Sequence, residues 1–337
     1  MKHITMITLA GALLSTAVSA QTTAYSKPSG YVTHTLKAGQ FNLIGLTLHE
    51  PVTVSGIFET VNGTSLTDDD VDFDSTLTAG KTYILEITEN TADPTMVGVI
   101  QEVTSWTGNT LTTPADLDTD GLATGAKYQL RAAKTIADVF GANNEAGLLA
   151  ATNITSADVV WLPNGSGFDK FYYSPGGGFG GGTAGWKDSS GQESANRPIV
   201  YTDAIFIQSR GTEDNELVIT GAVKVEGTSL ALAGDAFNFL SSTFPAGSTL
   251  DNSGLEDGLT QATNITSADV VWMPDGSGGY NKYYYSPGGG FGGGTAGWKD
   301  SSGQDAGSTP LTSAIIIQRK GSDTNADLTP PAEYGSL

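Results

Sequence analysis

The sequence predicts an all-β chain with tandemly duplicated antiparallel β-sandwich or barrel modules and a small β-barrel inserted in the first copy. Three observations lead to this prediction. Short runs rich in Val, Ile, Tyr, Phe and Trp alternate with turn clusters such as NGSG and GGGFGGG, as strands and hairpins do. A long segment occurs twice, which indicates a repeat. Its pieces lie close together in the second half of the chain and are separated by a further stretch in the first.

The duplication is visible as long matching segments. ATNITSADVVW occupies 151–161 and 262–272, and YYSPGGGFGGGTAGWKDSSGQ occupies 172–192 and 284–304 without a substitution. Each half also begins with a related segment, KAGQFN in the first and AGDAFN in the second. We therefore divide the chain into a signal peptide at 1–20, a first β module at 21–51 and 135–228, an inserted small β-barrel at 52–134, and a second β module at 229–337.

The individual elements follow from local patterns. In the insert, SGIFETVNGTSLT at 55–67 and VGVIQEVTSWTGNTLTT at 97–113 alternate apolar and polar residues around an Asn-Gly or Thr-Gly turn, which predicts hairpins. In the modules, ADVVWLP, KFYYSP, AGWKD and AIFIQSRG are the expected strands. The one expected helix is TIADVFG, with Thr135 as its N-cap and Gly141 as its C-terminal stop.

The first twenty residues have the layout of a secretory signal peptide. Lys2 and His3 precede an apolar run at 4–14, and small residues end at Ala20. The alternative is a short buried helix. The run is shorter than the ~20 apolar residues of a membrane span, so we expect no transmembrane segment. The predicted location is outside the cytoplasm, at the cell surface, in the medium or in the periplasm.

Composition narrows the classes of partner. The chain carries 16 basic and 36 acidic side chains, a formal charge of −20, so neither nucleic acid nor anionic lipid is an expected partner. It has no cysteine, so an exported form relies on its cores instead of disulfides.

The glycine-rich stretch at 176–181, GGGFGG, matches the spacing of a dinucleotide-binding loop. Such a loop must follow a strand and open a helix, and no helical pattern follows here. The phosphate-loop pattern also fails, because Lys187 stands between Trp186 and Asp188. We therefore interpret the stretch as the connection of a hairpin, with glycines supplying the positive φ angles of its turn.

Aromatic residues around this hairpin form the first candidate ligand site. Exposed aromatic rings bind the apolar faces of sugars, and the two copies supply eight of them: Tyr172, Tyr173, Phe179, Trp186, Tyr284, Tyr285, Phe291 and Trp298. Strand alternation places neighbouring tyrosines on opposite faces, so one of each pair is expected in the core.

Two acidic runs form a candidate calcium site, and calcium is the only cofactor that the sequence suggests. Alternate aspartates occur in LTDDDVDFD and DLDTDG, at Asp68, Asp70, Asp72 and Asp74 and at Asp116, Asp118 and Asp120. Alternating carboxylates before a glycine resemble the start of a calcium loop. The position where that loop needs a glutamate is Lys127, and the alternative is two solvated turns.

The sequence nominates no catalytic residue. After removal of residues 1–20, the remaining histidines are His34 and His49, too few for the common triads and zinc sites. A carboxylate pair is possible in principle, but no pair stands out. Asp158 and Asp188 recur in the second copy as Asp269 and Asp300, which favours a structural role.

Three segments carry a resemblance. SGYVTHTLKAGQFNLIGLTL, the YQLR-x-x-KTIADVFG segment and the repeated GWKDSSG are similar to those of a family of uncharacterised, signal-peptide-bearing secreted proteins that occur as multiple paralogues in verrucomicrobial-type bacteria. The resemblance covers nearly the whole mature chain. It implies export and a β-rich fold, and no catalytic residue.

These observations favour an exported, non-enzymatic β protein that acts at the cell surface or in the extracellular matrix through contacts with protein or polysaccharide. The first alternative is a carbohydrate-binding protein that uses Tyr and Trp platforms, and the second is a glycoside hydrolase. Unpaired strand edges also allow self-assembly.

Overall fold

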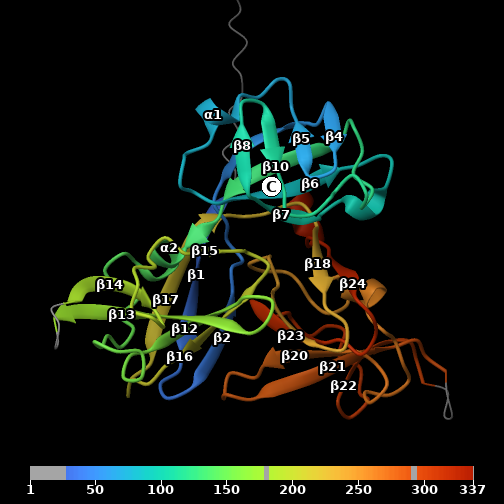
Figure 1. The fold of residues 1–337 in the computed structure, drawn as a ribbon. Coiled ribbons are helices and arrows are strands. Elements are labelled where there is room, and N and C mark those ends of the chain that lie inside the picture. The colour runs from blue at the N-terminus through green and yellow to red at the C-terminus, as the bar shows by residue number, and fades with distance from the viewer. Residues whose placement is uncertain (1–27, 178–181, 290–293, 337) are drawn as a thin grey trace, which may run out of the picture.

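The computed structural model describes residues 28–177, 182–289 and 294–336, and it confirms the predicted all-β class with antiparallel sheets throughout (Figure 1). Two of the predicted ligand residues, Phe179 and Phe291, lie outside the described residues. Within the described part, no helix is long and apolar enough to cross a membrane.

The first module is built on a five-stranded sheet. Its strands, in spatial order, are β14 (Gly182–Asp188), β13 (Phe168–Gly177), β12 (Val159–Pro163), β16 (Ala204–Gln208) and β2 (Phe41–Gly45). Val160 and Leu162 of β12 point into the core of this module, whereas Trp161, which lies between them, is only partly buried on the other face. The long pair of β1 (Ser29–Leu36) and β17 (Asn215–Ala222) and the short pair of β11 (Lys134–Thr135) and β15 (Pro198–Ile199) complete the module.

The second module repeats this arrangement. Its five-stranded sheet has the order β19 (Phe237–Ser241), β23 (Ala314–Gln318), β20 (Val270–Pro274), β21 (Tyr280–Ser286) and β22 (Gly297–Asp300), and the accompanying pair is β18 (Thr228–Leu232) with β24 (Thr324–Leu328). The cross-strand register is the same in the two copies, since Trp161 pairs with Lys170 as Trp272 pairs with Lys282. Two 3-10 turns, Leu255–Gly258 and Ala332–Ser336, belong to this half.

The insert has a core of its own, formed by Phe58, Phe73, Leu85, Tyr128 and their neighbours. One sheet contains β3 (Val52–Ile57), β10 (Lys127–Ala132), β6 (Tyr83–Glu89) and β7 (Ile100–Val103). The other contains β4 (Thr60–Asn62), β5 (Ser65–Thr67), β9 (Thr110–Thr112) and β8 (Ser105–Thr107). The predicted small barrel is wrong, because no strand pair in the described residues closes the two sheets into a ring. The helix α1 (Phe73–Thr76) and the 3-10 turn Pro94–Met96 lie in its loops.

The expected helix is confirmed as α2 (Ile136–Phe140). The Thr135 side chain accepts from the Asp138 backbone N–H, and the Asp138 carboxylate accepts from the Thr135 N–H, which makes a capping box. Gly141 ends the helix at φ 87°, in the region that favours glycine. Buried Phe140 fixes the helix to the core of the first module.

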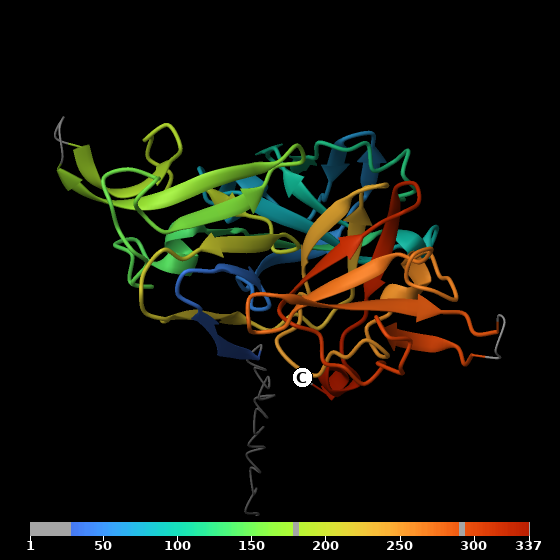
Figure 2. The same ribbon diagram turned by 90° about the horizontal axis from the view of Figure 1, so that it is seen from below.

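The two modules pack on each other through the outer faces of their five-stranded sheets. Leu43, Ala204, Ala314 and Ile316 are buried at the centre of this contact. The hairpins β13–β14 and β21–β22 consequently point to opposite sides of the molecule (Figure 2). Where β2 crosses the second module, a Cβ at Gly45 would lie 1.9 Å from the Ser313 carbonyl oxygen, so only glycine fits.

A buried network of charges joins the insert to the modules. Lys224, on the connection between the modules, forms an ion pair with Glu86 of β6, and both side chains are fully buried. Gln129 of β10 donates to Glu86 Oε2 over 2.7 Å, and Arg131 Nε lies 3.7 Å from the same oxygen. The Lys224 ammonium also donates to the backbone carbonyls at 226 and 227 over 2.6 Å each. The buried ammonium and carboxylate therefore have an opposite charge and hydrogen-bond partners in place of water.

Candidate functional site

The predicted role of Trp186 and Trp298 as a ligand platform is wrong, because both rings are core residues. Trp186 is 0% exposed, donates from Nε1 to the Gly141 carbonyl over 2.8 Å, and packs against Phe140 at 5.6 Å between ring centroids. Trp298 is buried in the core of the second module. A ring that is enclosed on both faces by protein cannot stack on a ligand.

The tyrosines of this candidate site are also covered. Tyr172 and Tyr284 are buried. Tyr173 and Tyr285 are partly buried and meet the core tryptophans edge-on, each at 5.6 Å between ring centroids. The prediction that one tyrosine of each pair is buried is confirmed for Tyr172 and Tyr284, whereas Tyr173 and Tyr285 pack against the tryptophans and are only partly exposed.

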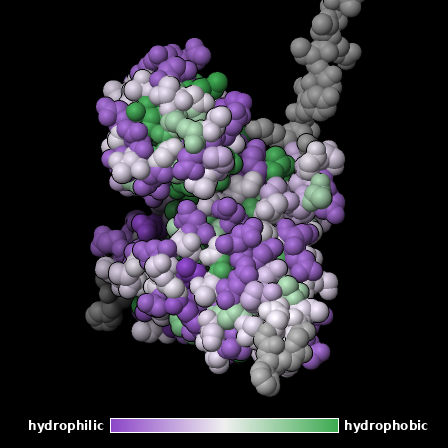
Figure 3. Space-filling view, turned by 90° about the vertical axis from the view of Figure 1, so that its right-hand side faces the viewer, coloured by the Kyte–Doolittle hydropathy of each residue, from purple (hydrophilic) through white to green (hydrophobic). Residues whose placement is uncertain are grey.

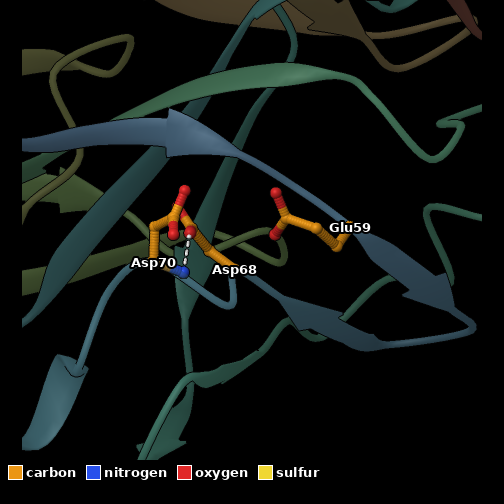
Figure 4. Close-up of side chains that lie close together, drawn as sticks. All are labelled: Glu59, Asp68 and Asp70. Atoms are coloured by element: carbon orange, nitrogen blue, oxygen red, sulfur yellow. Dashed lines mark hydrogen bonds between the residues drawn. The ribbon is translucent and has the colours of Figure 1, made fainter.

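The side chains of the first acidic run have separate structural roles. Glu59, Asp68 and Asp70 converge, with one oxygen from each within 4.8 Å of the others (Figure 4). Asp68 is buried, accepts from the Tyr128 hydroxyl over 2.7 Å and accepts from the Asp70 N–H over 2.9 Å. These carboxylates thus fix the turn after β5, and they are the only such group in the described residues.

The other predicted calcium ligands do not join this group. Asp72 is the N-cap of α1, and Asp74 accepts from the Gly108 N–H over 2.9 Å. In the second run, Asp116 accepts from the Thr119 N–H over 2.9 Å, while Asp118 and Asp120 are exposed in the same turn. Asp68 and Asp70 of the first run do converge, together with Glu59, but the predicted convergence is wrong for Asp72, Asp74 and the second run, because the chain turns at capping residues there.

His49 and the repeated aspartate Asp158 have structural partners. Nε2 of buried His49 lies 2.9 Å from the Thr243 carbonyl oxygen, so this nitrogen carries the proton and donates. Burial lowers the pKa of His49 to about 3, and burial also lowers that of His34. Asp158 is buried and accepts from the Leu149 and Arg210 backbone N–H groups, which anchors a loop.

The structure brings together a different set of side chains at the surface. In the first module, Lys170 Nζ lies 3.9 Å from the centroid of the Trp161 ring, and Phe41 meets the same ring edge-on at 5.8 Å. Phe41 is 50% exposed. We call these three residues, together with their counterparts in the second module, the aromatic–lysine clusters. Each presents a phenyl ring and an ammonium group to solvent over a tryptophan.

The second module has the same cluster with the same geometry. Lys282 Nζ lies 3.9 Å from the centroid of the Trp272 ring, and Phe237 meets that ring edge-on at 5.9 Å and is 49% exposed. Within the described residues, neither Lys170 nor Lys282 forms an ion pair with a carboxylate. Both ammonium groups are therefore available to a ligand.

The first cluster borders a groove between the modules. The groove has a volume of about 460 Å³, and Phe41 and Tyr280 face it from the two modules. Between them lie the hydrogen-bonding side chains of His34, Gln40 and Asn42. The combination of ring faces with polar groups suits a ligand that has both C–H faces and hydroxyl groups.

These clusters were missed from sequence because each one combines three distant segments. Phe41 comes from β2, Trp161 from β12 and Lys170 from β13, and no local pattern predicts that they meet. A usable signal was present, since all three residue types recur at the matching positions of the second copy.

Comparisons of the chain with protein-family models, with curated proteins and with solved structures find no match. The family resemblance therefore stays a prediction, and the function must be argued from the site.

Proposed function

We propose that the protein is exported and acts outside the cytoplasm as a non-enzymatic binding protein that holds polysaccharide through its two aromatic–lysine clusters. The observation that carries this proposal is the repetition of one cluster. Phe41, Trp161 and Lys170 recur as Phe237, Trp272 and Lys282, with the Lys–Trp distance 3.9 Å in both.

Physical chemistry favours a carbohydrate as the ligand. A half-exposed phenyl ring loses little conformational entropy when it buries the C–H face of a sugar. The adjacent lysine donates hydrogen bonds to hydroxyl or carboxylate oxygens. A repeating polymer can occupy both clusters, and two linked contacts bind more tightly than either one. The predicted signal peptide at 1–20 supports contact with material outside the cytoplasm.

Affinity electrophoresis in gels that contain individual algal, plant or bacterial polysaccharides tests the proposal. We expect at least one polysaccharide to retard the wild-type protein, and the double variant Phe41→Ala with Phe237→Ala to weaken that retention by about tenfold. These rings are half-exposed, so the variant should remain folded.

A matched control is Tyr31→Ala, which removes an aromatic ring that is 73% exposed and belongs to neither cluster. It should bind like the wild type. Retention of no polysaccharide by the wild-type protein, or equal retention of the wild type and the double variant, would contradict the proposal.

A further inference from the structure

A second hollow lies between the insert and the modules. It consists of two neighbouring spaces of about 670 and 290 Å³ that share Glu102, Val200 and Asp203. The insert contributes residues 95–102 and 114–120 to its wall, and the modules contribute β15, β18 and β19 with their loops. Figure 3 shows the surface hollowed between the insert, which forms the upper lobe, and the modules below. We call this hollow the roofed cleft.

The roofed cleft occupies a position equivalent to the open groove. Leu240, Thr202 and Asp203 line it, and the matching residues of the other copy, Ile44, Thr312 and Ser313, line the groove. The insert covers only one of these two equivalent positions. Asp203 lies at the covered position, and the matching residue in the uncovered groove is Ser313.

The walls of the roofed cleft are acidic over an apolar floor. Glu102 of β7, Asp120 and Asp203 supply three carboxyl groups. The apolar part consists of Met96, Val99, Ile100, Leu117 and Val200. Because the whole chain carries a formal charge of −20, the field inside such a cleft attracts cations.

Polar groups without partners point to a ligand in this cleft. Ser229 lines it, is 6% exposed, and its hydroxyl has no hydrogen-bond partner in the described residues. The Asp203 side chain likewise forms no hydrogen bond with any described residue. A buried hydroxyl without a partner is costly unless a ligand or water completes it.

The three carboxyl groups of the cleft do not converge on one point, so a single metal ion cannot bind all of them. Among the described residues, Glu102, Asp120 and Asp203 do not form a group whose oxygens all lie within 4.8 Å. An occupant that neutralises them must carry several positive charges spread along its length, and the apolar floor favours methylene groups between those charges.

We propose that the roofed cleft binds a linear polyamine, with its ammonium groups paired to Glu102, Asp120 and Asp203 and its methylene stems on the apolar floor. This site is separate from the aromatic–lysine clusters and does not rest on the proposed polysaccharide binding.

Polyamine binding should change the protonation of Asp203, which can be measured. Burial raises the pKa of Asp203 to about 7, against the opposing effect of Arg197, whose guanidinium is paired with Asp169 at 3.0 Å. The other ionisable groups facing the cleft are Glu102, Asp120 and Arg197 itself, which lines the smaller space. An ammonium ion favours the ionised carboxylate, so binding should release about half a proton at pH 7 and should strengthen as pH rises from 6 to 8.

Isothermal titration calorimetry with spermidine, in two buffers of different ionisation enthalpy, tests the proposal on the full mature chain. We expect saturable binding and proton release, and a loss of affinity on the order of tenfold in Asp203→Asn and in Glu102→Gln. Glu102 is exposed, so its variant keeps the fold even if Asp203→Asn does not.

Glu213→Gln is the matched control, because it removes an exposed carboxylate outside the cleft. It should bind spermidine like the wild type. Absence of spermidine binding, equal weakening by Glu102→Gln and Glu213→Gln, or full displacement by magnesium at equal charge would overturn the proposal. Phe41→Ala with Phe237→Ala should bind spermidine normally, which separates this test from that of polysaccharide binding.

Discussion

The first and second modules share their strand order, their buried tryptophan and their aromatic–lysine cluster, whereas they differ at their junctions with the insert, which contacts the first module and also β18 of the second. Asp203 replaces the serine found at 313, and Tyr201 belongs to a two-residue extension that packs edge-on against His49 at 4.7 Å. Both of these differences lie beside the junction with the insert. Substitutions at matched positions measure how far the two copies have become different.

The largest expected effect is at the buried tryptophans. Trp298→Ala should lower the free energy of unfolding by about 4 kcal/mol through the cavity that it leaves. Trp186→Ala should cost more, about 5 kcal/mol, because it also removes the donor to the Gly141 carbonyl. Urea unfolding followed by circular dichroism measures both. Unchanged stability with lost polysaccharide binding would restore the exposed-platform hypothesis.

A smaller effect on stability is expected in the buried charge network around Lys224 and Glu86, which the second module lacks. Lys224→Met removes the buried ammonium paired with Glu86, leaves that carboxylate only Arg131 Nε, at 3.7 Å, as a cation among the described residues, and should cost about 3 kcal/mol. Adding Glu86→Leu removes the buried carboxylate, while Arg131 keeps its pairing with Glu226 at 3.7 Å, and should restore most of that loss. The same urea titration tests both variants. A double variant no more stable than Lys224→Met would show that the network contributes through packing instead of charge.

The smallest effect depends on pH. The pKa of Asp203 is raised from 3.8 to about 7 in the folded state, so its contribution to stability is fully present below pH 3.8 and is lost as pH rises through 7. The full shift corresponds to roughly 4 kcal/mol, and because Asp203 is partly exposed to solvent we expect Asp203→Ser to stabilise the protein by about half of that, ~2 kcal/mol, at pH 8 relative to pH 4.

Thermal unfolding of wild type and Asp203→Ser across this range is the measurement. Ser313→Asp places a carboxylate in the open groove, where water reaches it, and should show little of this pH dependence. A difference between Asp203→Ser and wild type that does not change with pH would mean that the Asp203 carboxylate is well solvated.

The sequence predicted those features of the fold that depend on neighbouring residues. Apolar alternation indicated strands, and Thr135, Asp138 and Gly141 enclose α2 because capping is local chemistry. The barrel predicted for the insert was wrong because it depended on strand pairing between distant segments. Which strands pair across β3–β10–β6–β7 and β4–β5–β9–β8 depends on contacts between distant segments, which alternation does not specify.

The candidate site was harder to predict than the fold. Alternation shows which residues share a face of a strand, but not whether another element covers that face. Trp186 was therefore assigned to a ligand although protein encloses it. Conversely, Trp161 lies among buried residues on β12. Only the three-dimensional structure shows that Phe41 and Lys170 lie beside its ring.

The close approach of Gly45 to Ser313 bears on how this pair of modules arose. Were the pair a covalently joined symmetric dimer, both crossings would have to accept the same residue. The position matching Gly45 is Ser241, and its hydroxyl donates to the Leu46 carbonyl over 3.1 Å. A Cβ at the Gly45 crossing would overlap the opposing backbone. The second half can therefore not substitute for the first at this crossing, and a homodimer of the second module alone could not reproduce this contact.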